Sequence, residues 1–238
     1  MLHLARDILN MICEYKDNDI AFFMQAFHEG AYAFSKAALI RELYHNARII
    51  VRSDGGNLSS YDWKSLNVEF YDEERIFTAA NGGAAIHRMF ELFFINQSKF
   101  LIKIDPDTVF YRRFRYLPSI DGIFGTLQEL DGCKSIQGGF IGFSNSAAKK
   151  IHDSRLLLSA LLIEPSVDTS GYLAILGRRA QRVGLASFDW SLGWAAQALN
   201  IEMYEFQDVL SMWKEPTDNG DLRYAITHPD PSRINCSS

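Results

Sequence analysis

Cysteine, long apolar runs and clustered positive charge are all scarce in this sequence. The three cysteines, Cys13, Cys133 and Cys236, lie far apart and form no CxxC pair, which argues against a disulfide framework or a structural zinc site. No segment reaches the roughly 18 consecutive apolar residues of a membrane span, and the stretch 1–17 is too interrupted by charge for a signal peptide. We therefore expect a cytoplasmic protein without a transmembrane segment, with peripheral membrane contact left open.

The chain also lacks a long basic run and the Gly-rich phosphate-binding patterns GxGxxG and GxxxxGK[ST]. With a net charge of -5, its bulk electrostatics argues against a nucleic acid partner. Hydrophobic residues make up 47% of the 238 residues, which is enough to build a sizeable core. An acidic protein that binds an anionic substrate needs a metal ion or a local cluster of hydrogen-bond donors.

Strand and helix patterns alternate along the first half of the chain. Apolar runs predict strands and 3.6-residue periodicity predicts helices. The predicted strands are 19–27, 47–52, 66–72 and 100–104, and the predicted helices are 2–15, 33–46 and 82–96. This alternation is typical of an α/β fold with a mixed, mostly parallel central sheet flanked by helices.

The second half of the chain shows a less regular pattern. A mixed stretch at 135–144 is followed by predicted helices at 145–152, 154–183 and 189–200 and by a strand at 202–206. No repeat, low-complexity linker or composition shift divides the sequence. We therefore expect one domain over residues 1–238.

The stretch FLIKIDPDTVF, residues 100–110, ends an apolar strand at two carboxylates, Asp105 and Asp107. In open α/β sheets ligands bind beyond the carboxyl ends of the strands, and Pro106 pushes Asp105 towards an extended conformation. Two close carboxylates repel each other unless a cation or a proton lies between them. Oxygen ligands suit Mg²⁺ or Mn²⁺. The alternative is an exposed turn whose aspartates cap backbone N–H groups.

Two enzyme classes place an Asp-x-Asp motif after a buried strand. Asp105-Pro-Asp107-Thr-Val matches the DxDx[TV] signature of haloacid-dehalogenase-like phosphatases, in which Asp105 would be the nucleophile and Asp107 the general acid. That motif normally opens its chain, whereas several predicted strands precede it here. The later acidic pair of those phosphatases is also missing, because Gly220-Asp221 follows no apolar strand. The second class is the GT-A nucleotide-sugar glycosyltransferases. Because of the two differences above, the phosphatase is kept only as the alternative.

The motif order of the chain resembles inverting GT-A glycosyltransferases of the galactosyltransferase and Fringe type. Lys103-Ile-Asp105-Pro-Asp107-Thr-Val-Phe is similar to their K-x-D-x-D-x-[FV] block, and Gly138-Gly139 follows it as their Gly-Gly segment does. Phe188-Asp189-Trp-Ser-Leu-Gly matches the Asp and the Gly of their E-D-V-x-x-G motif but has Phe in place of Glu. A histidine near the carboxyl terminus, His228, completes the order.

This resemblance implies a metal site and a catalytic base. Mn²⁺ or Mg²⁺ would be held by a site of Asp105, Asp107 and His228, in which Asp107 touches the ion directly, Asp105 orients a water or the ribose, and His228 is a further ligand. Asp189 would be the catalytic base that takes a proton from the acceptor hydroxyl. Two residues have alternative interpretations, because Asp189 also suits the N-cap of helix 189–200 and His228 also suits an exposed tail.

The resemblance also implies a binding site for the nucleotide sugar. Gly138 and Gly139 would let the backbone approach the donor sugar, although a β-bulge or a turn explains two glycines equally well. The remaining nucleotide-sugar ligands would be Gln25, Ala26 and Phe27 at the end of the first strand, Asp54 after the second, and Lys103 and Asp105. Asp54 also fits a plain Asp-Gly turn.

The function implied is a metal-dependent hexosyltransferase that acts in polysaccharide biosynthesis. It would move a hexose from a UDP-hexose to a hydroxyl of a glycan or glycoconjugate acceptor, with inversion. A nucleotide-binding half would span about 18–110 and an acceptor-binding half about 111–230. A catalytically degenerate GT-A domain that only binds glycans is a further alternative.

Overall fold

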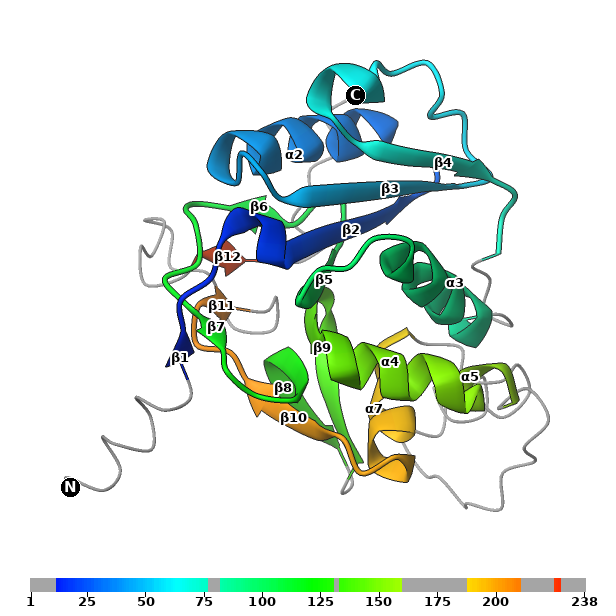
Figure 1. The fold of residues 1–238 in the computed structure, drawn as a ribbon. Helices are drawn as coiled ribbons and strands as arrows, with labels where there is room; N and C mark the ends of the chain where they lie inside the picture. Colours follow the sequence, from blue (N-terminus) through cyan, green and yellow to red (C-terminus); the bar gives the residue numbers. More distant parts are fainter. Residues whose placement is uncertain (1–11, 77–81, 131–132, 160–187, 211–224, 228–238) are drawn as a thin grey trace.

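The computed structural model describes residues 12–76, 82–130, 133–159, 188–210 and 225–227. A seven-stranded sheet forms its centre, in the spatial order β10-β8-β9-β5-β2-β3-β4 (Figure 1). The strands are β2 (Ile20–Ala26), β3 (Arg48–Asp54), β4 (Glu69–Glu73), β5 (Phe100–Ile104), β8 (Gly122–Leu130), β9 (Cys133–Ser144) and β10 (Glu202–Glu205). Strands β2 to β5 are parallel, β10 is parallel to β8, and β9 is antiparallel to both β5 and β8. The predicted mixed, mostly parallel sheet is therefore confirmed.

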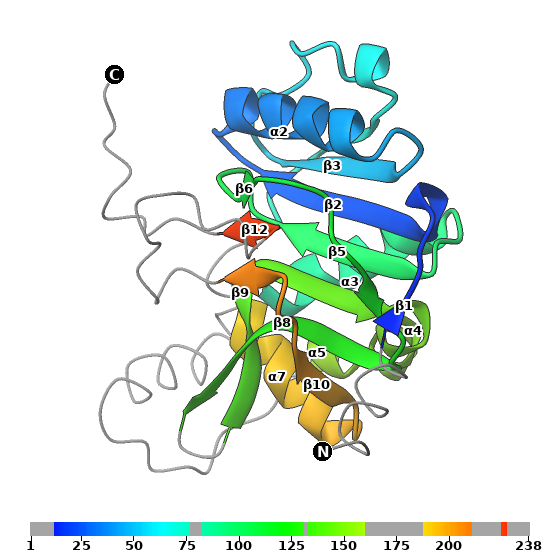
Figure 2. The ribbon, with the colours of Figure 1, turned by 90° about the vertical axis from the view of Figure 1, so that its left-hand side faces the viewer.

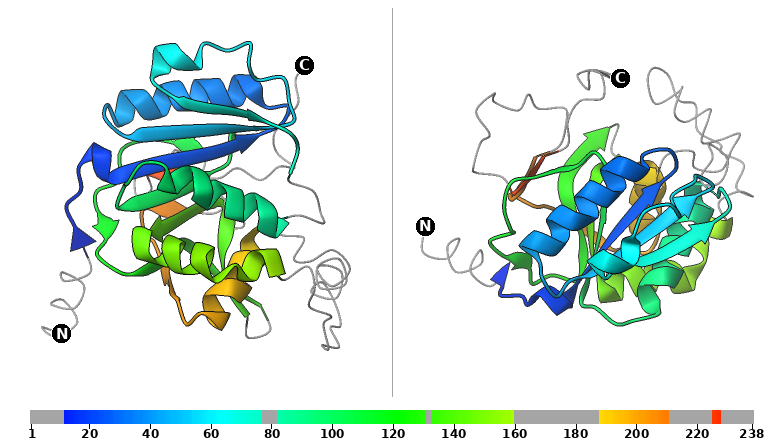
Figure 3. Two further views of the ribbon diagram at one scale, coloured as in Figure 1. Left: turned by 45° about the vertical axis from the view of Figure 1, so that its right-hand side comes forward. Right: turned by 90° about the horizontal axis from the view of Figure 1, so that it is seen from above.

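Helices cover both faces of this sheet (Figures 2 and 3). Helix α2 (Gly30–Leu43) packs on one face, and the other carries α3 (Gly82–Phe94), α4 (Asn145–Ser154), the short α5 (Leu156–Ser159) and α7 (Phe188–Ala198). Alternate residues of β2 enter separate cores, because Phe22 packs with α2 while Phe23 packs with α3. A strand buried on both faces reads as an unbroken apolar run, which explains the sequence of β2.

Short strands extend the fold beyond the main sheet. β1 (Ile12–Cys13) pairs with β7 (Leu117–Pro118), and β12 (Ile226–Thr227) lies between β11 (Val209–Leu210) and β6 (Val109–Phe110). Two 3₁₀ turns, η1 (Asp17–Asp19) and η2 (Trp63–Leu66), complete the elements. In the described part of the chain, no helix has the length and apolar character needed to span a bilayer.

Asp208 connects the small sheet of β11, β12 and β6 to the segment that follows β6. Its carboxylate is fully buried and accepts hydrogen bonds from the guanidinium groups of Arg112 and Arg115, while its carbonyl accepts from the N–H groups of Ala225 and Ile226. Burial alone would raise the pKa of Asp208, but the arginine hydrogen bonds lower it below its usual range. The chain around residue 226 is thereby anchored beside the acidic turn.

The predicted elements agree with the structure most closely in the first half. Strands 19–27, 47–52, 66–72 and 100–104 correspond to β2, β3, β4 and β5, helices 33–46 and 82–96 to α2 and α3, and the later helices 145–152 and 189–200 to α4 and α7. The late strand 202–206 is β10.

Three expectations differ from the structure. The predicted helix 2–15 is wrong at Ile12–Cys13, which form β1, and the rest of it up to residue 11 lies outside the described residues. The mixed stretch 135–144 is part of the long strand β9, and its partner β8 was not predicted at all. Of the predicted helix 154–183, the structure describes only the end of α4 and the short α5, since residues 160–187 lie outside the described part.

Candidate active site

The candidate site lies where the parallel strands β2, β3 and β5 end. Gln25 is paired with Arg52 in the register of β2 and β3, and Met24 is paired with Ile104 in the register of β2 and β5. The carboxyl ends of these strands therefore meet at one edge of the sheet. All of β5 is buried, so the strand fixes the place where the acidic turn of Asp105 begins.

The acidic turn is held in place by a lysine and a threonine. Nζ of Lys103 donates to Oδ1 of Asp105 and to the carbonyl of Gly138, each at 2.5 Å. Thr108 accepts a hydrogen bond from the N–H of Asp105 at 3.1 Å and donates to the carbonyl of Gly139 at 2.8 Å. The side chain of Asp105 nevertheless stays 36% exposed. The turn is thus fixed to β9 and still presents a carboxylate to solvent.

Asp189 approaches the same turn from the first residues of α7. Its Oδ2 accepts a hydrogen bond from the N–H of Gly138 at 2.9 Å, and its carbonyl accepts one from Ser135 at 2.8 Å. A Cβ at Gly138 would lie only 2.4 Å from Oδ1 of Asp189. The glycine therefore makes room for this carboxylate, and a contact of Gly138 with a donor sugar stays a prediction.

The surroundings of Asp189 raise its pKa. Burial is the largest cause, the nearby Asp105 adds to it, and Lys103 and the N–H of Gly138 act in the opposite direction, so that the pKa of Asp189 rises to about 6. A carboxylate with a pKa in this range can both take up and release a proton near neutral pH. This environment suits proton transfer, and the role of Asp189 as the catalytic base stays a prediction.

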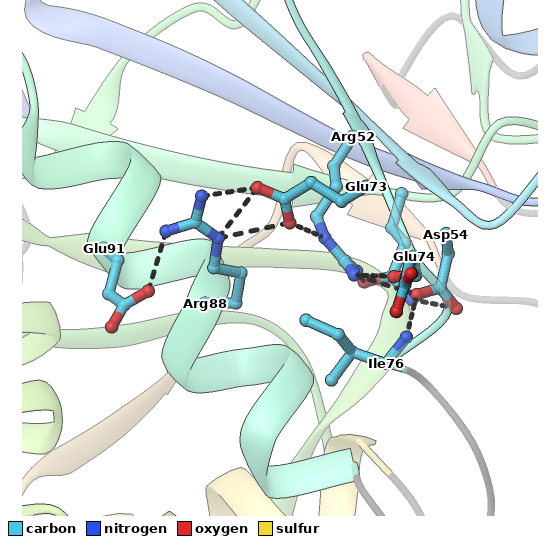
Figure 4. A network of polar contacts seen from close by, with 8 residues as sticks. Arg52, Asp54, Glu73, Glu74, Ile76, Arg88 and Glu91 are labelled. Carbon is cyan, nitrogen blue, oxygen red and sulfur yellow. Dashed lines mark hydrogen bonds and ion pairs between the residues drawn. The ribbon is translucent and has the colours of Figure 1, made fainter.

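A second polar group lies at the ends of β3 and β4 (Figure 4). The fully buried guanidinium of Arg52 contacts Oδ1 of Asp54 at 3.0 Å, Glu73 at 2.7 Å and the side chain of Gln25 at 2.9 Å. Asp54 also accepts a hydrogen bond from the N–H of Ile76 at 2.7 Å. Both Gln25 and Asp54 thus face Arg52, and their contact with a nucleotide stays a prediction.

The other predicted nucleotide ligands lie next to this group. Ala26 is buried in β2 opposite Ser53 of β3. The half-buried ring of Phe27 packs under the guanidinium of Arg75, whose Cζ is 4.3 Å from the ring centroid. The backbone N–H of Phe27 donates to the carboxylate of Glu29. These residues line the same edge of the sheet as the acidic turn.

The structure brings four of the predicted site residues into direct contact, and one predicted residue lies outside the described part of the chain. Lys103, Asp105, Gly138 and Asp189 form one group joined by hydrogen bonds, and the carbonyl of Gly139 holds Thr108 beside it. His228 lies outside the described residues.

Sequence reasoning missed several residues of this edge. Arg52 and Glu73 hold the second polar group, and Lys36 of α2 lies near Asp107. Burial lowers the pKa of Lys36, and the charge of Asp107 partly offsets this effect. The only sequence signal was the charge of Arg52 inside a buried strand, which calls for a partner of opposite charge.

Asp105 and Asp107 supply a donor set that suits a hard divalent cation, because both offer carboxylate oxygens. Lys103 already neutralises part of the charge of Asp105. Among the described residues, no third carboxylate or imidazole joins these two in a convergent three-ligand group. A further ligand would have to come from elsewhere, and Thr227, which precedes His228, is paired with Val109.

The architecture is the GT-A fold, an α/β fold with a mixed central sheet, as comparison with solved structures shows. An active-site variant of LgtC superposes with a TM-score of 0.52 at 10% sequence identity, covering 92% of this chain and 91% of that one. A structure of the galactosyltransferase LgtC with donor and acceptor sugar analogs gives a TM-score of 0.49 at 10% identity, over 89% and 87% of the two chains. No family model and no curated protein matches the sequence. The likeness to LgtC establishes the fold.

Proposed function

We propose that the protein is a metal-dependent glycosyltransferase that moves a hexose from a UDP-hexose to a hydroxyl of a glycan or glycoconjugate. The observation that carries the proposal is the hydrogen-bonded group of Lys103, Asp105, Gly138 and Asp189 at the carboxyl edge of the sheet. This group combines the accessible carboxylate of Asp105 with the carboxyl group of Asp189, whose pKa is raised to about 6. The GT-A fold supports the same assignment.

Asp105, Asp107 and His228 would hold Mn²⁺ or Mg²⁺. When bound, the cation supplies positive charge that stabilises the departing diphosphate. The register of β12 supports His228 as a ligand, since Ile226 pairs with Phe110 and Thr227 with Val109, so that this strand advances towards Asp107. The oxygen-rich donor set favours these hard cations over softer ones.

Asp189 would act as the general base. Its carboxylate is held by the N–H of Gly138 and would take the proton of the acceptor hydroxyl. The hydrogen bond fixes the carboxylate before the acceptor binds, and this preorganisation favours the reaction. Direct attack by the deprotonated hydroxyl on the anomeric carbon inverts its configuration. Inversion is therefore part of the proposal.

Lys103 and the second polar group would position the donor. Lys103 fixes the orientation of Asp105 and holds the strand that carries Gly138 and Gly139. Arg52 holds the ends of β2, β3 and β4 together, so that the backbone around Ala26 and Phe27 can contact the base. Asp54 would contact the nucleotide from beside Arg52, which holds its carboxylate at 3.0 Å.

Neither alternative function is favoured by a specific observation. A haloacid-dehalogenase-like phosphatase would use Asp105 as its nucleophile, but the likeness to the LgtC fold extends over 92% of the chain. A glycan-binding module without turnover would have no use for a proton acceptor with a raised pKa at Asp189. Both remain distinguishable outcomes of the following experiment.

The purified protein should be incubated with Mn²⁺ and a panel of nucleoside diphosphate hexoses, with and without glycan acceptors. We expect release of UDP from a UDP-hexose, stimulation by an acceptor, and loss of turnover in Asp107→Asn. The exposed Asp72 offers a matched control, since Asp72→Asn should retain full activity. NMR of the product would establish the anomeric configuration. Rapid hydrolysis of phosphomonoesters without donor cleavage would support the phosphatase instead.

A further inference from the structure

Two histidines and a glutamate gather on the helical face that carries α3 and α4. His87 and Glu91 are four residues apart on α3, and His152 lies near the end of α4. One potential ligand atom from each of the three residues lies within 4.8 Å of the other two. Nε2 of His87 is 3.7 Å from Oε1 of Glu91, and the two imidazole rings stack with centroids 4.5 Å apart. None of these residues belongs to the acidic turn.

We propose that His87, Glu91 and His152 form a binding site for a transition-metal dication of the Zn²⁺ class. Two imidazoles and one carboxylate are a ligand set that Zn²⁺ accepts, with water completing the coordination. Residues at positions i and i+4 lie on the same face of a helix, so α3 presents His87 and Glu91 together. The site differs chemically from the acidic turn, whose carboxylates favour Mg²⁺ or Mn²⁺.

The charged residues next to Glu91 and His152 each occupy one polar atom of these side chains and not the other. Oε2 of Glu91 accepts a hydrogen bond from Arg88 at 2.8 Å, while Oε1 of Glu91 faces His87. Nδ1 of His152 lies 3.0 Å from the carboxylate of Asp153, which leaves Nε2 of His152 as the ligand atom. A carboxylate bound to the second ring nitrogen is a common partner of metal-ligating histidines, because it fixes the tautomer and orients the ring.

Metal binding requires a change in the ring stack. The ring planes of His87 and His152 are only 12° apart, and an imidazole nitrogen binds an ion that lies in its own ring plane. One ion cannot lie in two stacked parallel planes, so one ring has to rotate. The side chain of His152 is 27% exposed and that of His87 only 10%, so His152 is the ring that turns. Its contact with the exposed carboxylate of Asp153 has to form again in the new orientation.

Such an ion would tie α3 to α4 and extend an existing polar chain. Glu91 would lie between the ion and Arg88, and Arg88 already forms an ion pair with Glu73 (Figure 4). Glu73 in turn holds Arg52 at the carboxyl edge of the sheet. A bound ion would therefore stabilise the packing of α3 beside that edge.

Competition for Zn²⁺ against a chromogenic chelator tests the proposal on the full-length chain. We expect His152→Gln to weaken Zn²⁺ binding at least about 10-fold, since even the loss of a partner that only orients a ligand costs that much. The exposed His45 lies elsewhere on the surface, so His45→Gln should bind like the unchanged protein. The double variant Asp105→Asn/Asp107→Asn should also retain this binding.

Thermal unfolding provides a second readout that does not depend on activity. Zn²⁺ should raise the Tm of the unchanged protein and of the double variant, but not that of His152→Gln. Circular dichroism of the metal-free variants checks that each is folded. Equal Zn²⁺ affinity in His152→Gln and the unchanged protein would overturn the proposal, as would loss of the Zn²⁺ effect only in the double variant.

Discussion

The N–H of Gly138 donates a hydrogen bond to the carboxylate of Asp189 across 51 residues of sequence. The carbonyl of Gly138 accepts a hydrogen bond from Lys103, which also binds Asp105. A single peptide segment thus links the proposed base to the proposed metal-binding turn. The relative position of Asp189 and Asp105 therefore depends on strand β9.

Replacing Asp189 tests its role as the base. Asp189→Asn keeps the shape and can still interact with Gly138, but it cannot accept a proton. We expect kcat for sugar transfer to fall by at least about 100-fold, the usual contribution of a general base. Affinity for UDP in the presence of Mn²⁺ should change little. An equal loss of activity in Asp72→Asn would show that the effect is not specific to the base.

The raised pKa of Asp189 predicts two pH effects. In the metal-free protein, NMR titration of this carboxyl group should give a pKa of about 6, compared with an ordinary value of 3.8. Because the folded state binds the proton more tightly, the stability contributed by this group is present below the unfolded pKa and is lost as pH rises towards 6. Asp189→Asn should remove this part of the pH dependence of unfolding.

The same group predicts the pH dependence of transfer. Only the carboxylate form of Asp189 accepts a proton, so kcat/KM should rise with pH and then level off. A cation bound by the neighbouring Asp105 adds positive charge, which places the apparent pKa at or below about 6. A rate that falls as pH rises through this range would contradict the assignment.

A methyl group at position 138 should disturb the site without removing any polar group. The Cβ of Gly138→Ala would lie 2.4 Å from Oδ1 of Asp189, so the carboxylate has to move away. A displacement of this kind is expected to lower kcat by about 100-fold. Circular dichroism and the Tm separate this effect from unfolding. An unchanged kcat in a folded Gly138→Ala protein would show that the position of Asp189 is unimportant.

Arg52 should be essential for stability at the ends of β3 and β4. Arg52→Met removes the common partner of Asp54 and Glu73. The almost fully buried Asp54 then lacks this positive charge. Breaking a buried ion pair in this way costs about 3–5 kcal/mol of the free energy of unfolding. Chemical denaturation measures the change. As a matched control, Lys149→Met removes a lysine whose ion pair with Asp153 lies on the surface, and little change is expected.

The sequence predicted the central part of the fold because the strands buried on both faces read as plain apolar runs. β2 and β5 are of this kind. β8 and β9 escaped prediction because glycines and polar residues interrupt their pattern. Several of these glycines are imposed by tertiary contacts, since a Cβ at Gly142 would collide with the ring of Phe124 and one at Gly125 with Ile136.

The position of Asp105 and Asp107 directly after a buried strand was predictable, because the apolar run of β5 leads into them. The surroundings of Asp54 were not predictable, because they depend on Arg52 and on Glu73, which is 21 residues further along the chain from Arg52. The interaction of Gly138 with Asp189 also depends on how α7 packs on β9. Local sequence contains no information about such long-range pairs.

Calorimetric titration with UDP tests the central claim most directly. It should be carried out with and without Mn²⁺ on the unchanged protein, on Asp107→Asn and on Asp72→Asn. The account predicts UDP binding that requires Mn²⁺, is lost in Asp107→Asn and is preserved in Asp72→Asn. Equal UDP binding with and without Mn²⁺, or by Asp107→Asn and the unchanged protein, would contradict the account.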